Sequence, residues 1–176
     1  MSCEQARNLL VKDGGSRTEI LLASGRMVHC GDMAPTTFVV VLRTATRGSV
    51  RDSVVKHVAW LLSDRRLLDS VIALSRESGI GVAGRTMALG LLTHYADMHA
   101  SLLPGLQHEP MPLVIAHEMH GDYILGSVPM DAADQDRAFA AIWHVARNEP
   151  DHNLRLLARR AAEQLGLRRG IHTDPR

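Results

Sequence analysis

The sequence has few aromatic residues, only two cysteines and no long apolar run. Six of its 176 residues are Trp, Tyr or Phe, so the core must be built from Leu, Val, Ile, Ala and Met, which commonly fill the space between packed helices. A chain of this length can bury one domain-sized core without disulfides or a structural metal. These shortages favour a single all-α domain over residues 1–176.

The two cysteines, Cys3 and Cys30, match neither a CxxC metal site nor a disulfide framework. Glu4 lies where a secretory signal would have its apolar core, and no run approaches the roughly 18 apolar residues of a membrane span. We therefore expect a soluble protein of the reducing cytoplasm with no membrane partner.

The chain also lacks an excess of either charge, because its formal net charge is +1 with acids and bases mixed along it. A dedicated nucleic-acid-binding domain would be strongly basic. Two arginine clusters could still contact phosphates, although acidic residues lie near both: Arg43, Arg47 and Arg51, and Arg155, Arg159, Arg160, Arg168 and Arg169. A nucleic-acid-binding module is therefore kept as a second alternative function.

Capping signals predict where several helices begin. Ser16 and Glu19 have the spacing of a capping box, in which each side chain satisfies a backbone donor of the other residue. Asp64 and Asp131 predict two further N-caps. Residues 4–12 are expected to form a short helix before Ser16.

Apolar periodicity predicts the remaining helices. The clearest spans 50–62, where Val50, Val54, Val58 and Leu61 share one face. Residues 36–42 are rich in β-branched side chains, but a helix is preferred there. The G-x-G-x-x-G spacing over 79–84 follows a helical pattern, so it predicts a turn with close helix packing instead of a nucleotide-binding loop.

Arginine recurs at a nearly constant interval. Arg17, Arg51 and Arg85 are 34 residues apart, and Arg155 follows 70 residues after Arg85, close to two more intervals. A period of about 20–50 residues is typical of proteins built from stacked structural repeats. We expect five repeats and a flexible tail, at about 4–31, 35–62, 64–95, 96–127, 131–166 and 167–176.

Several stretches resemble α-helical HEAT repeats, including the HEAT-like units of bilin lyases, in which a turn is followed by Val or Leu, then Arg, then small and apolar residues. They are residues 149–158, Gly48 to Arg51 with Val54 and Val55, and Gly84 to Gly90. The resemblance covers about 16–166 and departs from the pattern at Ser16 and over 96–130. It implies a right-handed α-solenoid of stacked antiparallel helix pairs with a concave groove.

In HEAT-like families the repeated arginines mostly join neighbouring repeats, so this resemblance implies a structural role for Arg17, Arg51, Arg85 and Arg155. The alternative is a row of arginines on the concave face that binds carboxylates or phosphates through forked hydrogen bonds. In that alternative, Arg51, Arg85 and Arg155 would contact the partner.

Histidines and acids gather where the arginine period fails. A zincin helix needs its second histidine four residues after His117, where this chain has Gly121. His117 and His120 nevertheless share one helical face and are the candidate metal ligands, with His94, Asp97 or His99 as further candidates. The candidate catalytic residues are His94, His117, Glu118, His120 and Asp122.

The sequence therefore predicts a small HEAT-like scaffold that binds a protein or peptide in its groove and has no chemistry of its own. No cofactor is expected. The first alternative is an enzyme or small-molecule-binding protein that uses the His and acid cluster over 94–122, with a divalent metal or acid-base catalysis.

Overall fold

A computed structural model describes most of the chain. The described residues are 1–12, 14–27, 30–46, 48, 59, 61–97, 111–112, 115–116, 123–124, 127–128 and 131–170. They form seven helices and four two-residue strands, and the expected all-α class is confirmed for the body of the fold. The predicted helix over 50–62 lies mostly outside the described residues.

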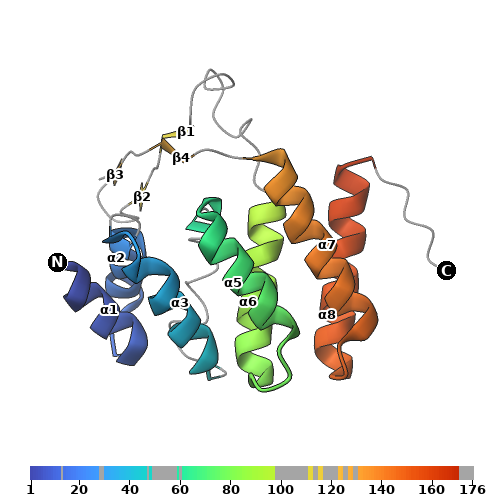
Figure 1. The fold of residues 1–176 in the computed structure, drawn as a ribbon, viewed down its shortest axis with the longest axis horizontal. Coiled ribbons are helices and arrows are strands. Elements are labelled where there is room, and N and C mark those ends of the chain that lie inside the picture. The colour runs from blue at the N-terminus through green and yellow to red at the C-terminus, as the bar shows by residue number, and fades with distance from the viewer. Residues whose placement is uncertain are drawn as a thin grey trace.

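The helices follow one another across the molecule in chain order (Figure 1). They are α1 (Cys3–Lys12), α2 (Arg17–Met27), α3 (Met33–Arg43), α5 (Arg65–Arg76), α6 (Val82–Asp97), α7 (Ala132–Asn148) and α8 (His152–Arg168). The helix predicted over 36–42 is confirmed within α3. Helix α8 extends to Arg168, into the range 167–176 that was expected to be a flexible tail, and residues 171–176 lie outside the described residues.

Local capping explains where several helices begin. The Ser16 backbone N–H donates to Glu19 Oε2 over 2.8 Å, and the Glu19 N–H donates to Ser16 Oγ over 3.3 Å. Asp64 accepts from the Arg66 N–H over 2.9 Å, and Asp131 accepts from the Ala133 N–H over 2.8 Å. The predicted capping box and the two predicted aspartate caps are therefore confirmed.

The two C-terminal helix pairs pack directly against each other. Helix α5 contacts α6 and α7, and helix α6 contacts α7 and α8. The repeat expected over residues 96–127 lies largely outside the described residues and stays a prediction. The described residues of that range beyond Asp97 form two short antiparallel strand pairs, β1 (Met111–Pro112) with β4 (Ser127–Val128) and β2 (Ile115–Ala116) with β3 (Tyr123–Ile124).

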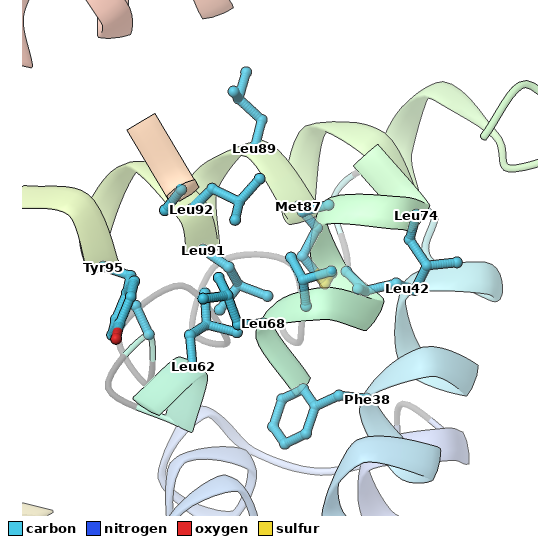
Figure 2. Packing of buried hydrophobic residues seen from close by; sticks show 14 of the residues in the cluster. Phe38, Leu42, Leu62, Leu68, Leu74, Met87, Leu89, Leu91, Leu92 and Tyr95 are labelled. Carbon is cyan, nitrogen blue, oxygen red and sulfur yellow. The ribbon is translucent and has the colours of Figure 1, made fainter. Parts of the chain in front are cut away.

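One apolar cluster extends through the helices of the fold. Phe38 and Leu42 of α3 lie in the same cluster as Leu68 of α5 and Leu91 of α6, and each of these side chains is almost fully buried (Figure 2). The cluster continues through α7 and α8 to Leu165. Aliphatic residues thus supply most of the core, as the shortage of aromatics predicts.

Gly84 permits a close approach between α6 and α3. A Cβ atom at this position would lie 2.6 Å from Ile80 Cγ2 and 3.2 Å from the Leu42 carbonyl carbon, with the Leu42 oxygen nearer still. Only a residue without a side chain fits beside this backbone. The expectation that the glycines over 79–84 serve a turn and close helix packing is confirmed at Gly84.

Ion pairs connect several of the helices that pack on one another. In the N-terminal half, Arg66 contacts Asp32, and Arg43 forms two hydrogen bonds of 2.7 and 2.9 Å with Glu77. Further pairs connect α5 to α7, α6 to α8 and α7 to the end of α8: Asp69 with Arg137, Asp97 with Arg168, and Asp136 with Arg169. Exposed pairs add little stability individually, but together they favour one alignment of the helices.

Cys3 and Cys30 form a disulfide, which corrects the prediction from the sequence. The bond joins the first residue of α1 to the turn before α3, and α1 packs on both α2 and α3. Disulfides are typical of oxidising compartments, so the cysteines no longer support the expectation of a reducing cytoplasm. The pairing was missed because it depends on the path of α2, which two isolated cysteines do not indicate.

Replacing both cysteines with serine should lower the free energy of unfolding by about 3–4 kcal/mol, because the bond closes a loop of 27 residues. Urea unfolding of the C3S/C30S variant measures the loss. Alkylation before and after reduction provides the control, with label on the native chain only after reduction. Labelling of both cysteines without reductant, or an unchanged urea midpoint, would contradict the expectation.

Candidate functional site

A groove lies between α6 and α8. Its larger part has a volume of about 640 Å³, and its smaller part, of about 310 Å³, shares Thr86 and Leu157 with it. Both volumes are typical of sites that bind small molecules or short peptide segments. This surface, called the α6–α8 groove below, is the candidate site.

The groove is apolar at its base and polar along its sides. Met87 and Leu89 of α6 lie at its base, each 2% exposed. Leu157 of α8 lines both parts and is 48% exposed. Polar side chains complete the larger part: Thr86, Thr93, His94, Arg160 and Gln164.

Helical spacing places these residues together. On α6, Thr86, Gly90, Thr93 and His94 follow intervals of three and four residues, so they share one face. The small side chains at 86, 90 and 93 leave space that leucines would fill. On α8, residues 157, 160, 161 and 164 follow the same intervals. These two stripes are the signal for the groove in the sequence. Of their residues, His94 and Arg160 were named as candidate site residues, but neither was assigned to a groove.

The two helices run in the same direction along the groove. The start of α6 and the start of α8 line its smaller part, through Val82, Ala83, Asn153 and Leu154. The later residues of both helices, including His94 and Gln164, line its larger part. The groove therefore has two different ends, one near the N-caps and one near His94.

Arg160 is the cationic side chain of the groove that has no ion-pair partner among the described residues. Its neighbours on α8 are engaged: Arg159 donates to Glu163 Oε1 over 3.0 Å, and Arg155 donates to the Glu149 carbonyl over 2.6 Å. The residues that line the larger part of the groove include no Asp or Glu. No acidic side chain among these lining residues would therefore repel a ligand carboxylate at Arg160.

No family model matches this chain, and no curated protein or solved structure matches it either.

Two of the repeated arginines have internal roles. Arg85 Nε and Nη2 donate to Glu149 over 3.1 and 3.0 Å, and Arg85 Nη1 donates to the Ile80 carbonyl. Arg155 donates to the backbone oxygen of the same Glu149. Because Arg85 is buried, it is not available to a partner, which corrects its assignment as a partner-binding residue. Arg51 lies outside the described residues, and Arg17 is an exposed residue at the start of α2.

Another charged cluster joins α5 to α7. Asp134 is 3% exposed at its side chain and accepts from Arg65 over 2.8 Å and from Arg137 over 3.1 Å. The Arg65 guanidinium holds the pKa of the Asp134 carboxyl below its ordinary value. Nearby, burial raises the pKa of the Tyr95 phenol to about 12. Both groups thus keep one protonation state near neutral pH, so neither is suited to proton transfer.

Of the candidate catalytic residues, the structure describes only His94, which lines the α6–α8 groove. The other four, His117, Glu118, His120 and Asp122, lie outside the described residues, and the metal site predicted at His117 and His120 stays a prediction. Where the structure describes the chain, no three His, Cys, Asp or Glu side chains are grouped so as to hold a metal ion.

The arginine clusters are largely neutralised where they are described. Arg43 is bound by Glu77, Arg168 by Asp97 and Arg169 by Asp136. Arg169 also lies over the Phe139 ring. Arg47 lies outside the described residues.

Among the described helices, none combines the length and the apolar character needed to cross a bilayer.

Proposed function

We propose that this protein is a HEAT-like repeat scaffold that binds a peptide segment of a partner protein in the α6–α8 groove. The observation that carries the proposal is the groove itself, which offers an apolar base between two parallel helices and hydrogen-bonding side chains along its length. Stacked helix pairs form such surfaces between their second helices. The packing of α5 on α7 and of α6 on α8 supports this architecture.

A peptide is favoured over a nucleic acid by the charges around the site. The structure describes several arginines of the two predicted phosphate-binding clusters. Most of these arginines already contact Asp, Glu or backbone oxygens of this chain. Phosphate binding would require these contacts to break. The groove itself contributes one arginine, Arg160, and has apolar side chains that a peptide can cover.

The test begins with a library of displayed random peptides, from which those that bind the intact protein are selected. Fluorescence anisotropy then measures the affinity of the enriched peptides for the protein. Leu157→Asp should weaken their binding at least about tenfold, because it places a charge where apolar side chains are expected to pack. Leu156→Asp is the matched control, since Leu156 is similarly exposed at 40% and does not line the groove. The proposal fails if no peptide binds, or if both variants bind the enriched peptides as the native protein does.

A further inference from the structure

The size of the α6–α8 groove limits what it can hold. Along α6 the lining residues extend from Val82 to His94, a distance of about 18 Å at the helical rise of 1.5 Å per residue. An extended chain covers roughly 3.3 Å per residue, so about five residues of a peptide fill the groove. This length fits a short linear segment of a partner.

The chemistry of the groove changes along its length. The end near the N-caps is lined by Val82, Ala83, Leu154 and Leu157, with Asp151 as its acidic residue. The opposite end has His94, Arg160 and Gln164. Asp151 already caps α8 by accepting from the Leu154 N–H over 2.9 Å. An occupant with apolar side chains at one end and an anionic group at the other would match this order.

Arg160 is the residue best placed to recognise the anionic group. It lines the larger part of the groove, is exposed, and has no ion-pair partner among the residues that the structure describes. A guanidinium binds a carboxylate through two parallel hydrogen bonds. Thr93 and Gln164 lie along the same part of the groove, and their side chains can bond to the backbone of an extended peptide.

We propose that the α6–α8 groove binds an extended peptide of about five residues, whose apolar side chains cover Leu157 and whose carboxylate is bound by Arg160. This inference rests on the proposed function and specifies its ligand. The carboxylate comes either from an Asp or Glu side chain or from the C-terminus of the peptide. The two sources share their chemistry and are separated in the experiment.

The experiment uses synthetic six-residue peptides in two libraries, one with free C-terminal carboxylates and one with C-terminal amides, screened on the intact protein. Bound peptides should contain a carboxylate next to apolar residues. Enrichment of Asp or Glu in the amidated library assigns the carboxylate to a side chain, and binding only by the free-carboxylate library assigns it to the C-terminus. Replacing the assigned carboxylate by an amide should weaken binding about tenfold.

Arg160→Gln should remove the preference for the carboxylate and weaken binding about tenfold. Arg159→Gln is the matched control, because Arg159 pairs with Glu163 and does not line the groove. If the peptides that bind lack a carboxylate, or Arg160→Gln binds them unchanged while Leu157→Asp does not, this inference is wrong and the proposed function stands. If Leu157→Asp does not weaken the binding of any peptide, the proposed function itself fails.

Discussion

Replacing Arg85 with methionine is expected to lower the free energy of unfolding by about 3–5 kcal/mol. The variant leaves the Glu149 carboxylate, which is 4% exposed at its side chain, without its buried cation. It also removes the donor to the Ile80 carbonyl in the turn before α6. Arg85→Lys should lose much of the same stability, because an ammonium cannot contact both Glu149 oxygens and Ile80 in the guanidinium geometry.

Urea unfolding followed by circular dichroism measures the effect. In the double variant Arg85→Met/Glu149→Leu, part of the lost stability should return, because no charge stays buried. Arg159→Met is the control, since its partner Glu163 is exposed and a change below about 0.5 kcal/mol is expected. If Arg85→Lys keeps full stability and loses peptide binding, Arg85 is a binding residue and its structural role here is refuted.

Gly84→Ala should destabilise the protein by about 3 kcal/mol or more, at the upper end of the range for overpacked cores. The new methyl group would overlap the Leu42 carbonyl and would lie 2.6 Å from Ile80 Cγ2. A flexible side chain could move away, but the Leu42 obstacle is helix backbone. The contact can be relieved only by separating α6 from α3, which opens the apolar cluster around Leu42.

Gly81→Ala is the matched control for Gly84→Ala, because a Cβ atom at Gly81 meets nothing within 4 Å. Thermal unfolding of both variants, followed by circular dichroism, compares them directly. The control should unfold close to the native temperature, while Gly84→Ala should unfold well below it. Equal unfolding temperatures would mean that α6 does not pack on α3 as closely as described.

Features set by neighbouring residues could be predicted from the sequence. The capping box at Ser16 and Glu19 and the caps at Asp64 and Asp131 each depend on residues two or three positions apart. The relevant hydrogen bonds form within one turn of helix, so the local pattern contains the whole interaction. Helix starts were therefore predicted well.

Features that join distant residues could not be predicted in the same way. The partner of Arg85 is 64 residues away, and the partner of Cys3 is 27 residues away. The arginine period pointed to residues that connect helices, and Arg85 and Arg155 do so. It did not identify Glu149, to which both arginines are hydrogen-bonded, because the sequence around an acidic residue in a turn does not indicate that its side chain is buried.

The groove depends on two helices that the sequence predicted separately. Thr86 and Thr93 are polar residues in the mostly apolar helix α6, while Arg160 and Gln164 look like ordinary surface residues of α8. Their common site exists only because α6 packs on α8. The residue pattern of either helix alone does not show that the two helices share a surface.

The direct contact between the last two helix pairs has a consequence for how the chain can vary. Gln135 Nε2 donates to the Tyr95 carbonyl over 3.0 Å, so the end of α6 and the start of α7 already meet. Residues 98–130 therefore connect two neighbouring points of the helical body. Because Tyr95 and Gln135 meet directly, the contact between α6 and α7 does not specify how many residues join the two helices, so connections of other lengths are compatible with it.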